Sequence, residues 1–79
     1  MKTTKQNTID TFTHNVVFLR KTNHISKKRM AKILGISIYS LNQIEKGLLP
    51  PKLSVEVLFK IRSYFHVSEK QQVEKKLDE

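Results

Sequence analysis

Apolar residues recur along the chain at the spacing of α-helices, after a polar beginning. Phe12, Val16 and Leu19 stand at i, i+4 and i+7, which places them on one face of a helix. We expect this first helix to span about residues 11–22. Residues 1–10 are mostly polar, so we expect them to form a flexible N-terminal arm that adds nothing to the core.

Two short helical segments follow, and each begins at a serine and ends at a glycine. Ser26 and Ser37 are placed to accept hydrogen bonds from the first turn of the helix that follows each of them. Gly35 and Gly47 stand where a helix end favours a positive φ. The helices are expected over about residues 27–34 and 38–45. Two short helices joined by so short a turn are typical of a helix-turn-helix.

The last part of the chain predicts two further helices, over about residues 55–65 and 69–77. The first of them carries an apolar stripe that we expect to be buried, made of Val55, Leu58, Phe59, Ile61 and Phe65. Ser68 and Gln71 have the spacing of a capping box at the start of the second. The predicted fold is therefore all-α, a compact five-helix domain over residues 11–77.

The composition narrows the range of partners. The chain has 79 residues, which is enough for one domain, and it has no cysteine. Fifteen lysine and arginine residues oppose seven acidic ones, so the net charge of +8 favours a polyanion such as DNA, RNA or an acidic membrane surface. No apolar run approaches the roughly 20 residues of a membrane span. The beginning of the chain does not look like a secretory signal, and we expect a cytoplasmic protein.

The segment over residues 26–47, SKKRMAKILGISIYSLNQIEKG, resembles the helix-turn-helix of the phage repressor/Cro (Xre-like) family. The matching features are a large apolar residue followed by alanine, Leu-Gly-Ile-Ser at the turn, Glu-x-Gly at the end, and Pro51 shortly afterwards. A later Val-Ser also matches, with His66 where the family has glycine. The resemblance covers roughly residues 11–73. It implies a repressor-like DNA-binding domain with its helix-turn-helix at the second and third helices.

The resemblance also implies that the helix over residues 38–45 reads the major groove of double-stranded DNA. With Leu41 and Ile44 directed inward, the expected base-reading residues are Ile38, Tyr39, Asn42 and Gln43. Asparagine and glutamine bond adenine, apolar side chains touch the thymine methyl, and this helix has no arginine to read guanine. We therefore expect a site rich in A·T pairs. The alternative is that Ile38 and Tyr39 belong to the core or to a protein interface.

A group of cationic and hydroxyl side chains around the same segment is expected to contact DNA phosphates. The group consists of Ser26, Lys27, Lys28, Arg29, Ser37, Ser40, Lys46 and Lys52. Cations at a helix N-terminus oppose the helix dipole, whereas a bound phosphate is favoured there. The alternative is a solvated basic face. The family often has glutamine at the position of Lys27, where it contacts a phosphate or another reading residue. This chain departs from the family pattern there, so the resemblance does not carry that contact over to Lys27.

Two further predictions concern charged residues that are not expected to read bases in the major groove. In the family, an arginine near the end of the first helix pairs with the glutamate of Glu-x-Gly, which implies a structural ion pair between Arg20 and Glu45. We interpret Glu45 as structural and not catalytic. Lys2 and Lys5 in the polar arm are candidates for the minor groove, with plain disorder as the alternative.

Enzymatic and metal chemistry find little support in the residues present. The acidic residues are scattered, and Gly35 and Gly47 are the only glycines, so no glycine-rich phosphate loop exists. His14, His24 and His66 lack paired ligand spacing. We expect no enzymatic activity, no metal, no cofactor and no small-molecule substrate.

The class of partner leaves two alternatives open. The same fold also binds proteins, so an antitoxin or an anti-repressor is the second interpretation beside a transcriptional repressor. RNA suits a reading helix less well, because the major groove of A-form RNA is deep and narrow. One domain covers only a half-site, so we expect a homodimer on a pseudo-palindrome. The candidate dimer contacts are Leu48, Leu49 and Phe59.

Overall fold

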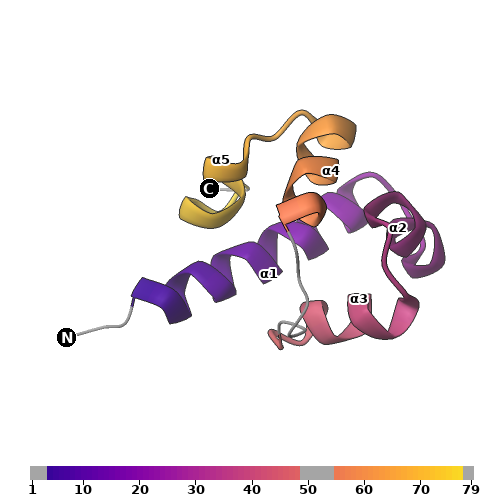
Figure 1. Ribbon diagram of the computed structural model, residues 1–79, viewed down its shortest axis with the longest axis horizontal. Helices are drawn as coiled ribbons and strands as arrows, with labels where there is room; N and C mark the ends of the chain where they lie inside the picture. Colours follow the sequence, from indigo (N-terminus) through magenta and orange to yellow (C-terminus); the bar gives the residue numbers. More distant parts are fainter. Residues whose placement is uncertain (1–3, 49–54, 78–79) are drawn as a thin grey trace.

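The computed structural model describes residues 4–48 and 55–77, and all regular elements in these ranges are α-helices. Figure 1 shows their order, which is α1 (Thr4–Thr22), α2 (Lys27–Leu34), α3 (Ile38–Glu45), α4 (Val55–Phe65) and α5 (Glu69–Glu74). The all-α, five-helix fold class is confirmed for the described residues.

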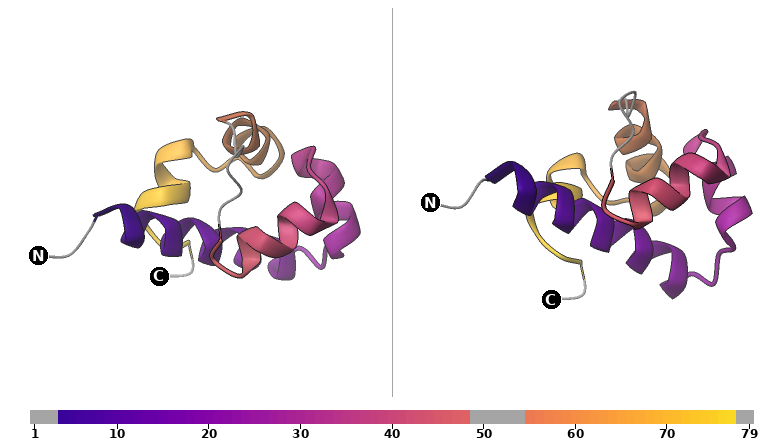
Figure 2. Two further views of the ribbon diagram at one scale, coloured as in Figure 1. Left: turned by 60° about the horizontal axis from the view of Figure 1, so that its bottom comes forward. Right: turned by 90° about the horizontal axis from the view of Figure 1, so that it is seen from below.

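Helix α1 is the longest of the helices, and it packs against α3 and α5. Figures 1 and 2 show α5 beside the N-terminal half of α1, with α2 and α3 near its C-terminal half. Helix α4 packs against both α2 and α5. The core draws on α1 to α4, through Phe12, Val16, Leu19, Met30, Ala31, Leu34, Leu41, Ile44, Val57 and Ile61.

Serine caps define where α2 and α3 begin, and a glycine in the left-handed conformation defines where α2 ends. Ser26 Oγ accepts a hydrogen bond from the Arg29 backbone N–H at 3.2 Å, and Ser37 Oγ accepts one from the Ser40 N–H at 3.0 Å. Gly35 has φ +73° directly after α2, a conformation that glycine adopts without strain. These local signals place the start of α3 only a short turn after α2.

The expectation of an N-terminal arm reaching residue 10 is wrong, because α1 begins at Thr4. The N-terminal half of α1 lies beside α5 (Figure 1), and Ile9 within it is half-buried. Tertiary packing thus makes a mostly polar segment helical, overriding its weak pattern. Lys2 lies outside the described residues, and the backbone of Lys5 is helical.

Helix α5 ends at Glu74, earlier than the predicted 69–77. Asn15 on α1 explains the early end. Its side-chain N–H groups donate to the Gln72 and Lys75 carbonyl oxygens at 2.8 and 3.0 Å, and its Oδ1 accepts from the Leu77 N–H at 2.8 Å. The chain therefore leaves the helix at Lys75, where φ is −146°, to satisfy a buried asparagine.

The buried face of α4 differs from the predicted apolar stripe. Val57 and Ile61 are buried, whereas Val55 and Phe59 are 78% and 50% exposed. Val55 and Phe59 are four residues apart and share an exposed face of α4. The guanidinium of Arg62 lies 4.9 Å from the centre of the exposed Phe59 ring, which gives that ring a cation–π partner.

His66 occupies a left-handed backbone position at the end of α4, with φ +61°. Its backbone N–H donates to the Arg62 carbonyl at 2.9 Å, so the position closes the helix. A histidine pays a steric penalty there that glycine does not. We expect His66→Gly to raise the free energy of unfolding by about 0.5–1 kcal/mol, measured by urea denaturation.

The matched control for this substitution is Ser63→Gly, at an exposed position inside α4. Glycine weakens a helix interior, so this control should lower the free energy of unfolding by about 0.5–1 kcal/mol. A loss of stability in His66→Gly equal to that of the control would contradict the interpretation.

Candidate nucleic-acid interface

Helix α3 is fixed to the rest of the domain by one face. Leu41 and Ile44 are fully buried, as the pattern predicts. The hydroxyl of Thr13 on α1 donates to the Ile44 carbonyl oxygen at 3.0 Å. The opposite face of α3 is thereby presented to solvent in a fixed orientation.

The four predicted base-reading residues lie on the solvent-facing side of α3. Ile38 is 44% exposed and Tyr39 is 72% exposed, so neither belongs to the core. Asn42 and Gln43 are partly exposed on the same helix. A large exposed aromatic and an exposed isoleucine beside two amides form a surface that fits a binding partner.

A basic surface adjoins α3 at the start of α2. Lys28, Arg29 and Lys32 line a shallow hollow together with the capping residue Ser26. The first turn of α2 has no acidic residue to offset these charges. Cationic side chains and the positive end of a helix dipole therefore act together here, and both attract an anion.

Arg20 and Glu45 form the ion pair that the resemblance implies. Arg20 Nε donates to Glu45 Oε2 at 2.6 Å, and Arg20 Nη2 donates to Glu45 Oε1 at 3.1 Å. Both side chains are largely buried, at 14% and 9% exposure. Arg20 Nη1 also donates to the Ile25 carbonyl at 3.3 Å. This fork ties the end of α1 to the end of α3.

Lys27 differs from the neighbouring lysines because its ammonium is directed to α3. Its Nζ lies 3.0 Å from Asn42 Oδ1 and 3.9 Å from Glu45 Oε1. Sequence reasoning placed Lys27 only among phosphate contacts and missed the contact with Asn42. The signal available was the family's glutamine at this position, which contacts another reading residue.

The remaining predicted phosphate contacts are spread over α3. Ser37 and Ser40 lie at its start, where their hydroxyl oxygens are 3.1 Å apart. Lys46 is exposed at the other end of α3. Lys52 lies outside the described residues. The structure thus brings Ser37 and Ser40 together and leaves Lys46 at a distance from them along the helix.

The comparison with known families identifies the class of protein. A family model described as helix-turn-helix matches residues 18–72, well over half of the chain. The chain belongs to the helix-turn-helix family of the phage repressor/Cro (Xre-like) type. The family binds DNA and is generally non-enzymatic, so the protein carries a DNA-binding helix-turn-helix domain. No curated protein and no solved structure matches the chain.

Two buried polar residues position the last helix of this helix-turn-helix protein and were missed by sequence reasoning. Asn15 binds α5 as described above, and Gln72 Nε2 donates to the Leu58 and Val67 carbonyl oxygens, both at 3.0 Å. The available signal was the place of Asn15 between Phe12 and Leu19, inside the apolar stripe of α1. A polar residue in such a stripe needs buried partners.

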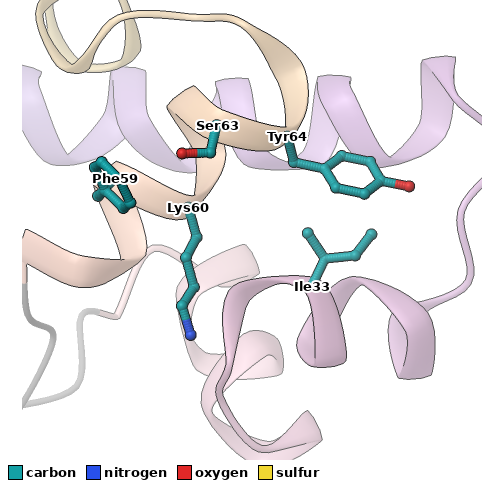
Figure 3. Close-up of a pocket in the computed structure, with 5 residues that line it drawn as sticks. All are labelled: Ile33, Phe59, Lys60, Ser63 and Tyr64. Carbon is teal, nitrogen blue, oxygen red and sulfur yellow. The ribbon is translucent and has the colours of Figure 1, made fainter.

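A second exposed apolar area lies away from α3, between α2 and α4. Figure 3 shows the residues that line this hollow, which are Ile33, Phe59, Lys60, Ser63 and Tyr64. Phe59 and Tyr64 are each about half exposed. The ammonium of Lys60 reaches Gly35 at the end of α2, where cations are favoured. The hollow therefore combines exposed aromatic side chains with one cation.

The described ranges offer neither a membrane-spanning helix nor a metal site. None of the described helices is long and apolar enough to cross a membrane. Residues 4–48 and 55–77 contain no group of three histidine or acidic side chains close enough to hold a metal ion.

Proposed function

We propose that the protein is a sequence-specific, double-stranded DNA-binding transcriptional regulator of the repressor/Cro type, acting in the cytoplasm. The observation that carries the proposal is the fixed outward face of α3 beside the basic start of α2. Leu41 and Ile44 anchor one side of α3, and Thr13 holds its C-terminal end. A helix held in this way can enter the major groove with its N-terminal half toward the bases.

Base reading in this proposal depends on amide and apolar side chains. Gln43 has the donor and acceptor pair that matches adenine, and Ile38 can contact a thymine methyl group. Tyr39 is exposed beside Ile38 and adds a second apolar contact. Because α3 contains no arginine or lysine, the proposal predicts a site rich in A·T pairs.

Backbone contacts come from the basic hollow at the start of α2. Lys28, Arg29 and Lys32 supply the charge, and Ser26 supplies a hydroxyl. Such contacts position a protein on the duplex without reading its sequence. They also make binding depend steeply on salt, because each neutralised phosphate releases counterions.

The proposal predicts a specific change in salt dependence when one of these charges is removed. Lys28→Gln should weaken binding to all duplexes alike and reduce the slope of log K against log salt by about 0.9. The measurement is a series of fluorescence-anisotropy titrations of a labelled duplex at increasing salt concentration.

Lys70→Gln is the matched control, because it lowers the same net charge of +8 by one at an exposed position on α5. This control should leave the slope unchanged. Equal slopes for the two variants would mean that net charge alone drives binding, and would contradict a phosphate contact at α2. Indifference of the wild-type protein to DNA at low salt would overturn the whole proposal.

We include a homodimer on a pseudo-palindromic site in the proposal, because one domain covers a half-site only. Two of the candidate contacts are available at the surface, since Leu48 is 55% and Phe59 is 50% exposed. Leu49 lies outside the described residues. Sedimentation of the DNA complex should give two protein chains per duplex, and a one-to-one complex would remove this part of the proposal.

A protein-interaction module, such as an antitoxin or an anti-repressor, is the second candidate function. The hollow between α2 and α4 favours it, because Phe59 and Tyr64 expose aromatic surface there without a described helix covering them. The two candidates differ in their response to the salt series. A protein that ignores duplex DNA at low salt and still binds a protein partner would have this second function.

A further inference from the structure

Lys27 stands at a position that is unfavourable for a cation unless something compensates it. It is the first residue of α2, at the positive end of the helix dipole, and the first turn has no acidic side chain. The compensation comes from α3, through Asn42 Oδ1 at 3.0 Å and Glu45 Oε1 at 3.9 Å. The ammonium is therefore tied to the reading helix.

The chemistry of this contact fixes the orientation of the Asn42 amide. An ammonium has three donors and no acceptor, whereas an amide has one oxygen that accepts and one NH₂ group that donates. Lys27 can therefore hold only the oxygen of Asn42. The Nδ2 atom of Asn42 makes no hydrogen bond with any of the described residues. The NH₂ group of Asn42 is therefore available to donate to a partner outside the domain.

Glu45 keeps Lys27 near α3. Its carboxylate is held by the fork of Arg20, with a side chain only 9% exposed, so it cannot move away with Lys27. The fixed negative charge therefore attracts the Lys27 ammonium toward α3, although the Lys27 side chain is 49% exposed. Hydrogens of the ammonium that do not point to Asn42 remain available for a phosphate oxygen, so this role is compatible with a backbone contact.

We propose that Lys27 is a positioning residue that makes Asn42 a donor-only reader of DNA. The inference rests on the proposed function, because it requires α3 to lie in the major groove. A free asparagine recognises adenine with its oxygen and nitrogen together. With its oxygen held by Lys27, Asn42 presents only N–H donors, so it loses the bond to the adenine N6 amino group and keeps at most the bond to adenine N7. It therefore favours a base edge made of acceptors, which is thymine O4 or guanine O6 and N7, over adenine.

The test is in vitro selection from a random duplex pool with the wild-type protein, Lys27→Met, Lys28→Met and Asn42→Ala. Asn42→Ala identifies the base position that Asn42 reads, because the preference there is lost. The wild-type protein should enrich thymine or guanine at that position. Lys27→Met frees the amide to turn, so adenine should gain on the order of tenfold in relative enrichment.

Lys28→Met is the matched control for this selection, since it removes the same charge from the next residue of α2. It should leave the base preference unchanged. The proposal is overturned if Lys27→Met behaves in the same way, with weaker binding and an unchanged preference. It is also overturned if the wild-type protein enriches adenine at the position that Asn42 reads.

A measurement on the free protein separates this inference from the proposed function. Lys27→Met should shift the side-chain NH₂ signals of Asn42 in the ¹H–¹⁵N NMR spectrum, and Lys28→Met should not. Unmoved Asn42 signals would overturn the contact itself. A wild-type pool without any enriched sequence would instead overturn the proposed function, and the reading role of Asn42 with it, whatever the NMR spectrum shows.

Discussion

Glu45→Gln should lower the free energy of unfolding by about 3 kcal/mol. The substitution leaves the Arg20 guanidinium, which is only 14% exposed, without a negative partner, and such stranded charges cost about 3–5 kcal/mol when buried. Lys27 loses its charged neighbour at the same time. Folded proteins have a free energy of unfolding of about 0.05–0.15 kcal/mol per residue, which gives roughly 4–12 kcal/mol for the whole domain. A loss of about 3 kcal/mol is therefore a large part of the stability. Urea denaturation measures it.

Glu69→Gln is the matched control for this prediction. Glu69 pairs with Arg62 at 3.2 Å, but both side chains are nearly half exposed. Exposed pairs contribute about 0–1 kcal/mol, so the same change of carboxylate to amide should have little effect. Equal losses for Glu45→Gln and Glu69→Gln would show that the link between α1 and α3 does not depend on the buried pair.

Asn15→Leu should lower the free energy of unfolding by a similar amount, about 3 kcal/mol. Leucine has nearly the shape of asparagine but offers no hydrogen bond to the Gln72 and Lys75 carbonyl oxygens or to the Leu77 N–H. Each buried group left unpaired costs about 1–3 kcal/mol. Urea denaturation measures the loss, and hydrogen exchange of the Leu77 amide should become faster.

Asn23→Leu is the matched control, because Asn23 is exposed just after α1 and donates to the Leu19 carbonyl at 2.7 Å. A single, part-buried hydrogen bond contributes about 0.5–1.5 kcal/mol, so the control should lose less stability. Unchanged protection of the Leu77 amide in Asn15→Leu would contradict the account of how α5 is held on α1.

The parts of the fold that sequence reasoning predicted correctly are those encoded by local signals. The ends of α2 and α3 depend on the caps at Ser26 and Ser37 and on Gly35, which act within one turn of the chain. The capping box of Ser68 and Gln71 is equally local and is present. Residues that are close in sequence and restrict the same backbone need no knowledge of the tertiary structure.

The parts that the sequence could not predict depend on distant contacts. The first turns of α1 and the early end of α5 follow from the packing of these two helices and from Asn15, whose partner Leu77 is 62 residues away. The exposure of Phe59 depends on which side of α4 faces its neighbours. The contact between Lys27 and Asn42 likewise exists only because the turn sets α2 against α3 at one angle.

The most direct test of the central claim is an NMR titration of the free protein with an A·T-rich duplex at low salt. The account predicts that backbone amide shifts change along the outward face of α3 and at the start of α2, including Tyr39, Gln43 and Lys28. It predicts no comparable change around Ser63 and Tyr64, which line the hollow between α2 and α4. Shifts confined to that second area, or no shifts at all, would contradict the claim that α3 is the DNA-reading helix.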